Sequence, residues 1–338
     1  MQAIHLTAPS LDAFRRVTLP EPVAQRGEVL IRMKAASLNF IDVAVATGAY
    51  PGPVFPLVPV ADGAGEVVAV GPEVDTLVPG DRVVLHPKAL WPAGRGNARN
   101  ARAMRGVNLP GSLREFAVAS ADTVVKVPSR LSWEQAAALP ITATTAWNAL
   151  VAADIAPGST VAVLGTGGAA IFTIQLAKAR GATVIVTSSS DAKLARARGL
   201  GADHGINYVA TPEWDREVLA LTGGRGVDLV LETAGAQTLS RSLNAVCHGG
   251  TVFTIGFLSG SQTEVDLMTI IGKSIRLQGN NTGSAADLAD AVAAIAASGL
   301  EPVVDRVYSL EEMSSAYAAL AKGGSHFGKL AITLDFAR

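Results

Sequence analysis

The chain has 338 residues, of which 49% are hydrophobic and 17% are charged. This length suits two domains or one large α/β unit, and the composition excludes a disordered, solvating chain. The net charge is −1, without the basic excess of a general nucleic-acid or membrane-surface binder. Cys247 is the one cysteine, which excludes a disulfide framework and any metal site that needs two or more thiolates.

The sequence predicts neither a membrane span nor a secretory signal. No stretch reaches the roughly 18 uninterrupted apolar residues of a membrane span. The first ten residues, MQAIHLTAPS, have neither the basic nor the apolar region of a secretory signal. We therefore expect a soluble, cytoplasmic protein that binds neither membrane nor nucleic acid.

The first 125 residues or so consist of short β-rich runs separated by proline and glycine, a pattern typical of an irregular β-barrel. The runs are 29–33, 65–70, 82–85, 115–118 and 124–127.

From residue 132 onward, apolar strands alternate with helical stretches. Strands are predicted at 160–164, 183–187, 227–232, 251–255 and 274–277, with helices at 167–180, 191–200 and 237–246. Continuous apolar strands alternating with helices indicate a parallel sheet covered on both faces. Two more helices, 285–297 and 310–321, and a strand, 328–334, complete the chain.

The segment 88–114 differs from its surroundings because it contains six basic residues and no acidic one: Lys88, Arg95, Arg99, Arg102, Arg105 and Arg114. We call it the basic segment. It is interpreted first as a mobile, solvated loop, and alternatively as a recognition element for an anionic substrate or cofactor.

A glycine-rich turn, VAVLGTGGAA at 161–170, lies between a predicted strand and a predicted helix. Gly165 permits a tight turn, Gly167 lets the backbone approach a pyrophosphate, and Gly168 and Ala169 open the helix whose N–H groups face the anion. In this βαβ context the pattern predicts a dinucleotide site, whereas an isolated glycine pattern would not.

The end of the second strand of this unit distinguishes the two nicotinamide dinucleotides. An NAD site favours an acidic residue there, but this chain has Ser188 and Ser189, followed by Lys193. Hydroxyl groups and a cation suit a 2′-phosphate, so we predict NADPH. Asp191 complicates the prediction, and it is interpreted as the N-cap of the following helix.

The order of these features resembles the medium-chain dehydrogenase/reductase superfamily, and within it the zinc-free branch related to quinone oxidoreductases. The motifs that carry the resemblance are SLNFID (37–42), GAY (48–50), ADGAGEV (61–67), ALPITATTAW (138–147), the glycine turn, and FGKL (327–330). The resemblance implies a GroES-like catalytic domain at 1–127 and 281–338, and a Rossmann NADP-binding domain at 128–280. It also implies that the substrate lies in a cleft between them.

Zinc members of the superfamily bind their catalytic metal through three positions. By the resemblance these fall at Asn39, at Ala61 and Asp62, and at Ile141. A catalytic zinc requires about three protein ligands, so one aspartate is not enough. The histidines His5 and His86 are interpreted as core or surface residues. We therefore predict no metal.

Without a Lewis acid, reduction of a quinone or an activated alkene is easier than alcohol oxidation, because added hydride gives a delocalised anion. Such an anion requires a hydrogen-bond donor. The resemblance makes Tyr50 the candidate donor, with Asn39 as a second donor to the acceptor carbonyl and Asp42 as a brace; Tyr50 as a packing residue is the alternative.

The resemblance also assigns cofactor contacts beyond the glycine turn. Thr142 and Thr145 are placed at the nicotinamide end, Tyr208 with Lys193 at the 2′-phosphate, Gly256 at the carboxyl edge of the sheet, Asn280 at the ribose, and Lys329 at the cofactor or as a domain brace.

Two other functions remain open at this point, an alcohol or aldehyde dehydrogenase and an NADPH-binding protein with little turnover. By analogy with relatives, we expect a homodimer formed along the strand at 274–277, because an exposed edge strand requires cover.

Overall fold

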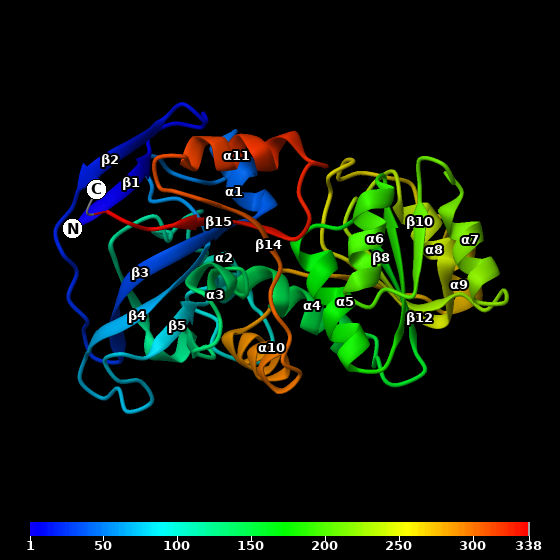
Figure 1. Cartoon of the computed structure of the whole chain (residues 1–338), viewed down its shortest axis with the longest axis horizontal. Helices are drawn as coiled ribbons and strands as arrows, with labels where there is room; N and C mark the ends of the chain where they lie inside the picture. Colours follow the sequence, from blue (N-terminus) through cyan, green and yellow to red (C-terminus); the bar gives the residue numbers. More distant parts are fainter. Residues whose placement is uncertain (337–338) are drawn as a thin grey trace. The chain divides into compact units, whose positions relative to one another are not determined.

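The computed structural model describes residues 1–336 (Figure 1). The chain forms two compact units. Unit 1 comprises Met1–Thr144 together with the segment that begins at Gly283, and unit 2 comprises Thr145–Thr282. No helix among residues 1–336 is both long enough and apolar enough to cross a membrane.

Unit 1 contains a seven-stranded, mostly antiparallel sheet and a separate two-stranded sheet. In the large sheet the order is β14-β15-β3-β4-β5-β7, and β6 pairs with the first half of β3. The strands are β1 Gln2–Leu6 and β2 Phe14–Thr18, which form the small sheet, and β3 Glu28–Leu38, β4 Asp62–Val70, β5 Arg82–Leu85, β6 Phe116–Ser120, β7 Val124–Lys126, β14 Val304–Tyr308 and β15 Lys329–Thr333.

The helices of unit 1 are short, and they flank the sheet. They are α1 Phe40–Ala46, α2 Ala98–Arg102, the 3₁₀ turn Ala121–Thr123, α3 Trp133–Ala137, α10 Ala285–Ala297 and α11 Met313–Lys322; α4 Pro140–Ala152 crosses into unit 2. Helix α3 packs on β3, β4 and β15. Residues 128–144 therefore group with unit 1, whereas the sequence places the domain boundary at 127.

The register of three strands brings distant parts of the sequence together in unit 1. Strand β3 pairs antiparallel with β4, so Ser37 lies opposite Asp62. It also pairs antiparallel with β15, so Leu38 lies opposite Leu330. Asn39, Asp62 and Lys329 consequently meet at one end of the sheet, although nearly 300 residues separate the first from the last along the chain.

Unit 2 is a six-stranded parallel sheet with the order β10-β9-β8-β11-β12-β13. Its strands are β8 Thr160–Leu164, β9 Thr183–Ser188, β10 His204–Asn207, β11 Val227–Glu232, β12 Val246–Thr254 and β13 Arg276–Gly279. Its helices are α5 Gly168–Ala179, α6 Asp191–Gly199, α7 Trp214–Leu221, α8 Leu239–Ala245 and α9 Leu267–Lys273.

The strand order of unit 2 reverses at β8, because β9 and β10 lie on one side of it and β11 to β13 on the other. All five residues of β8 are buried, as expected for the central strand of a sheet covered on both faces. Open parallel sheets bind ligands at the carboxyl ends of the strands, at the point where the order reverses. In unit 2 that point is the turn after β8, which contains the glycine motif.

Candidate functional site

Four polar side chains form a buried cluster at the end of β3, β4 and β15 in unit 1. We call Asn39, Asp42, Asp62 and Lys329 the polar cluster. Lys329 is 3% exposed and Asp62 is fully buried. Asn39 is the N-cap of α1, and Asp42 lies in its first turn, where the two form a capping box. Asn39 and Asp42 lie three residues apart in the sequence, which is the spacing that a capping box requires.

The polar cluster is held by direct hydrogen bonds. The Lys329 Nζ donates to Asn39 Oδ1 at 2.6 Å and lies 3.7 Å from Asp62 Oδ2. The Asn39 side-chain amide donates to Asp62 Oδ2 at 2.8 Å and, more weakly, to the Ser37 carbonyl at 3.5 Å. Both amide hydrogens of Asn39 are therefore engaged inside the protein.

Asp42 acts as a brace between two segments. Its carboxylate accepts from the backbone N–H of Asn39 at 2.7 Å and from that of Ala61 at 2.9 Å. It thereby fixes the start of α1 against the residue that precedes Asp62. These contacts agree with the bracing role that the sequence suggests for Asp42.

Burial controls the charges in the polar cluster. It raises the pKa of Asp42 to about 7 and that of Asp62 to about 6, and it lowers the pKa of Lys329. The Lys329 ammonium partly offsets the effect on both carboxyl groups. The backbone N–H of Ile141 also donates to Asp62 Oδ2, at 3.3 Å, whereas the buried Oδ1 of Asp62 has no hydrogen-bond partner within residues 1–336.

Tyr50 lies just beyond the opposite end of α1 from Asn39. Its backbone N–H donates to the Ala44 carbonyl, and its ring packs partly buried on the core of unit 1. Among residues 1–336 its hydroxyl forms no hydrogen bond. Helix α1 separates Tyr50 from the polar cluster, so the structure does not group the three predicted catalytic side chains into one hydrogen-bonded set.

The glycine turn of unit 2, where the sequence predicts a pyrophosphate site, lies between β8 and α5. Gly165 adopts a φ of +82°, which favours glycine. Gly167 is the N-cap of α5 and supplies no side-chain cap, so the first N–H groups of the helix are not satisfied by one. A Cβ added at Gly167 would meet nothing within 4 Å, which leaves open space above Gly168 and Ala169 for an anion.

The residues predicted for a 2′-phosphate come from two adjacent strand ends. Ser188 ends β9, its carbonyl accepts from the backbone N–H of Tyr208, and Ser189 is exposed beside it. Lys193 lies in the first turn of α6. The prediction that Asp191 is the N-cap is wrong: Ser190 occupies that position and accepts from the Lys193 N–H, because its hydroxyl precedes the first turn.

The Asp191 carboxylate instead accepts a hydrogen bond from Asn207 at 2.9 Å. This bond joins the start of α6 to the end of β10. At the carboxyl end of β9, Ser189 is exposed, whereas Ser188 is buried and its hydroxyl accepts from the Ser190 backbone N–H at 3.3 Å.

Two of the residues predicted for the nicotinamide end are adjacent in unit 2. The Asn280 side chain donates to Thr145 Oγ1 at 3.4 Å. Thr142 lies one turn earlier on α4 and donates to the Ala138 carbonyl. Gly256 lies just after β12, where a Cβ would come within 2.1 Å of the Thr233 carbonyl. Close packing against that carbonyl requires glycine at 256, independently of any cofactor.

Sequence reasoning missed Glu232, which ends β11. Its buried carboxylate accepts from the backbone N–H groups of Ala234 and Gly235, and from the hydroxyls of Thr238 and Ser242. An acidic residue directly after the apolar run Leu229–Leu231 was the available signal. Its contacts show that Glu232 orders the loop after β11 at the carboxyl edge of the sheet.

The basic segment is not a solvated loop throughout, so that part of its interpretation is wrong. Lys88, Arg105 and Arg114 are buried, whereas Arg95, Arg99 and Arg102 are exposed. The Lys88 ammonium donates to the Ala101 carbonyl at 2.6 Å, which ties the start of the segment to α2. Backbone bridges from Lys88 to Met104 and from Arg105 to Leu109 fold the segment back on itself.

Family models match both parts of the chain. Residues 25–129 match the alcohol dehydrogenase GroES-like domain, and residues 168–297 match the zinc-binding dehydrogenase domain. The fold class predicted from the sequence, a GroES-like domain with a Rossmann domain, is confirmed.

Curated relatives span nearly the whole chain. A zinc-type alcohol dehydrogenase-like protein of Schizosaccharomyces pombe is 38% identical, with 91% of each chain covered. An acryloyl-coenzyme A reductase of Metallosphaera sedula is 30% identical over 94% of this chain and 95% of its own. A quinone oxidoreductase of Mus musculus is 28% identical over 93% of this chain and 91% of its own.

Solved structures agree in fold and differ in activity. An NAD-dependent alcohol dehydrogenase superposes with a TM-score of 0.89 and 32% identity, covering 99% of this chain and 100% of its own. A crotonyl-CoA carboxylase/reductase in complex with NADP superposes with a TM-score of 0.86 and 26% identity, covering 99% of this chain and 94% of its own. These neighbours share nicotinamide dinucleotides as cofactors.

Proposed function

The chain belongs to the medium-chain dehydrogenase/reductase superfamily, and we propose that it is an NADPH-dependent reductase of quinones or activated alkenes that operates without zinc. The polar cluster is the observation that carries this proposal. At two of the positions where zinc relatives bind their metal, this chain has the Asn39 amide hydrogen-bonded to the Asp62 carboxylate, and the Lys329 ammonium donates to Asn39 and pairs with Asp62.

These residues do not fit a zinc ion. Zinc requires about three deprotonated nitrogen, oxygen or sulfur ligands in tetrahedral geometry. Within residues 1–336 no group of three or more histidine, cysteine, aspartate or glutamate side chains could bind a metal. The Lys329 ammonium, 3.7 Å from Asp62 Oδ2, already neutralises the one carboxylate at that position, and a cation beside it would be repelled.

The absence of a fitting metal site favours acceptors that delocalise their own charge. Alcohol oxidation requires a group that stabilises an alkoxide, and in the polar cluster the Asn39 amide and the Lys329 ammonium are already engaged with each other and with Asp62. When hydride adds to the carbon β to a carbonyl, the alkene electron pair moves to the carbonyl oxygen as an enolate, and a proton at the α-carbon completes the reduction. A quinone likewise becomes a hydroquinone anion. One hydrogen-bond donor at the oxygen then suffices.

Tyr50 is the proposed donor to that oxygen. Its hydroxyl has no partner within residues 1–336, so its O–H is available to donate a hydrogen bond. Asn39 is proposed as a positioning residue rather than a direct donor, because both its amide hydrogens are engaged. Asp42 supports Asn39 through the capping box.

The cofactor assignment rests on unit 2. The glycine turn fits the pyrophosphate of a nicotinamide dinucleotide, which supplies the hydride when bound. Ser188 and Ser189 stand at the end of β9, Lys193 in the first turn of α6 and Tyr208 directly after β10, and these hydroxyls and this cation are the groups that a 2′-phosphate would require. We propose NADPH for this reason. Thr142, Thr145, Gly256, Asn280 and Lys329 stay predictions as cofactor contacts.

The test is oxidation of NADPH and of NADH against a quinone, an enone, a 2-alkenoate, an enoyl-CoA and an aldehyde, with a parallel measurement of bound metal. We expect chelator-resistant turnover with NADPH and at least one quinone or alkene, and no stoichiometric metal. Chelator-sensitive turnover of an alcohol or aldehyde with one zinc per chain would refute the proposal. Tight NADPH binding without turnover of any acceptor would favour the binding protein instead.

We also propose that the chain forms a homodimer through the β13 edge of unit 2. Among residues 1–336 strand β13 pairs only with β12, and all four of its residues are exposed. Leu277 on β13 and Met268 and Ile271 on the adjoining α9 present apolar side chains there, 42%, 72% and 67% exposed. Light scattering should show a dimer for the native chain and a monomer for Leu277→Lys, with Val209→Lys as the matched surface control. A native monomer at micromolar concentration would refute it.

A further inference from the structure

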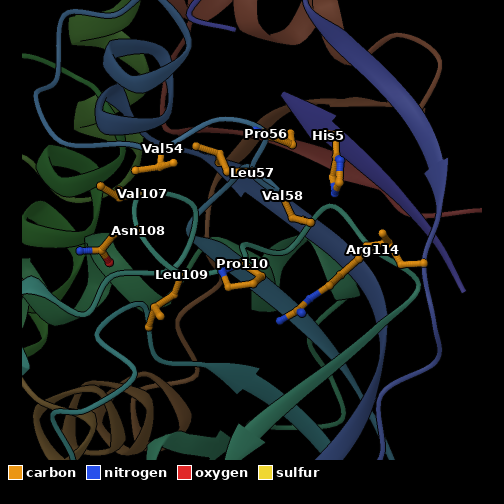
Figure 2. Close-up of a pocket in the computed structure, with 11 residues that line it drawn as sticks. His5, Val54, Pro56, Leu57, Val58, Val107, Asn108, Leu109, Pro110 and Arg114 are labelled. Atoms are coloured by element: carbon orange, nitrogen blue, oxygen red, sulfur yellow. The ribbon is translucent and has the colours of Figure 1, made fainter. Parts of the chain in front are cut away.

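Unit 1 contains a pocket of about 280 Å³ that includes none of the proposed catalytic or cofactor residues. We call it the Arg114 pocket. Its walls are mostly apolar and come from β1, the segments before β3 and β4, and the basic segment (Figure 2). The lining residues are His5, Leu19, Val54, Pro56, Leu57, Val58, Val107, Asn108, Leu109, Pro110 and Arg114.

Arg114 is the one permanently charged side chain that lines the pocket, and its guanidinium has no hydrogen-bond or ion-pair partner in the described part of the chain. It is 8% exposed, and within residues 1–336 its Nε is buried without a hydrogen-bond acceptor. In Figure 2 its guanidinium extends along the pocket toward Pro110. A buried guanidinium normally bonds to a carboxylate, a phosphate or backbone carbonyls, because leaving its donors unsatisfied costs free energy.

A second buried guanidinium increases the local positive charge. Arg105 is 5% exposed, and its Nε donates to the His86 carbonyl. Burial, and to a lesser extent the charge of Arg105, lowers the pKa of Arg114 to about 10. Among residues 1–336, neither arginine forms an ion pair with a carboxylate. Over the described residues, the protein thus buries two guanidinium groups without an ion-paired carboxylate.

The wall of the pocket that contains residues 107–110 is held firmly in place. The backbone N–H of Gly111 donates to the Val58 carbonyl at 2.7 Å. A Cβ at Gly111 would come within 2.3 Å of the Pro59 carbonyl, and one at Gly106 within 2.7 Å of the Val60 backbone. Glycine at 106 and 111 lets the two segments pack backbone to backbone, so the main chain that carries this wall of the pocket is fixed.

We propose that the Arg114 pocket binds a small organic carboxylate with an apolar body. The guanidinium supplies the donors for the carboxylate, and the Leu57, Val58 and Leu109 side chains contact the apolar part. A carboxylate satisfies the planar fork of Arg114 bidentately and compensates its charge. Inorganic phosphate would leave the apolar walls without a partner. The volume is near the lower end of the range for ligand pockets, which limits the ligand to a small molecule.

Calorimetric titration of the full chain with benzoate and with hexanoate tests the proposal, with benzyl alcohol and hexanol as neutral matches. We expect saturable binding of at least one carboxylate, at least about tenfold weaker binding of its alcohol, and a loss of about tenfold or more in Arg114→Met. The matched control Arg95→Met removes an exposed arginine of the same segment and should leave the affinity unchanged.

A second variant keeps the proposal testable if Arg114→Met does not fold. Leu109→Trp retains Arg114 but fills the pocket, and it should abolish carboxylate binding while leaving NADPH oxidation unchanged. Absence of carboxylate binding at millimolar concentration, equal affinity for acid and alcohol, binding of inorganic phosphate in preference to both carboxylates, or undiminished binding in Leu109→Trp would each overturn the proposal.

Discussion

Replacing Lys329 with methionine removes the ammonium of the polar cluster while retaining a long apolar stem. In the native protein this ammonium donates to Asn39 Oδ1 at 2.6 Å and lies 3.7 Å from Asp62 Oδ2. Its loss leaves the Asp62 carboxylate fully buried, with only the Asn39 amide and the Ile141 N–H as donors. Removal of one partner from a buried ion pair costs about 3–5 kcal/mol, so we expect Lys329→Met to destabilise the protein by that amount at about pH 8.

The pH dependence of this loss identifies its cause. Because the folded-state pKa of Asp62 is raised, to about 6, the folded state binds this proton more tightly than the unfolded state. Stability from this group is therefore present at low pH and is lost as pH rises from about 4 through the folded pKa. Without Lys329 the pKa of Asp62 rises further. The free energy of unfolding therefore continues to fall at higher pH, by about 1.4 kcal/mol for each unit by which this pKa is raised.

Urea denaturation of the native protein, Lys329→Met, Asp62→Asn and the double variant at about pH 6 and about pH 8 measures this coupling. In the native background, we expect Lys329→Met to destabilise the protein more at pH 8 than at pH 6. In the Asp62→Asn background, we expect its effect to be the same at both pH values. A loss below about 1 kcal/mol at pH 8, or the same pH dependence in both backgrounds, would show that Lys329 does not compensate Asp62.

Three further predictions concern the site residues individually. Asp42→Asn should reduce the fall in the free energy of unfolding between about pH 4 and pH 7, measured by urea denaturation. The pKa of Asp42 is raised to about 7, so the stabilising contribution of its protonated form is lost as pH rises through that range. An unchanged pH dependence of the free energy of unfolding would contradict this prediction. Lys193→Ala should raise the KM for NADPH about tenfold or more without changing that for NADH, whereas Arg198→Ala at the other end of α6 should change neither; equal effects on both cofactors would contradict a 2′-phosphate contact. Tyr50→Phe should lower kcat for the preferred acceptor by about a hundredfold with little change in the KM for NADPH, and an unchanged kcat would exclude Tyr50 as the donor.

Local patterns in the sequence were enough for the sheet of unit 2 and its glycine turn. Strands β8, β9 and β11 lie within one residue of their predicted bounds, because a buried parallel strand is a continuous apolar run that ends at a turn. The prediction is less accurate at the edges. Strand β13 begins two residues later than predicted, and β10 and α7 were missed, since edge elements are short, partly exposed and less apolar.

The sequence by itself determined the residue types that exclude thiolate metal sites, the turn that fits a pyrophosphate, and the hydroxyls and lysine beyond β9. Only the tertiary structure decided the partners of those residues that lie far apart in the chain. The register of β15 on β3 places Lys329 against Asn39 and Asp62, and the folding of the basic segment buries Arg105 and Arg114 without an anion. A linear pattern records spacing within one element, whereas charge compensation depends on which elements pair, and that pairing is set by the packing of the whole unit.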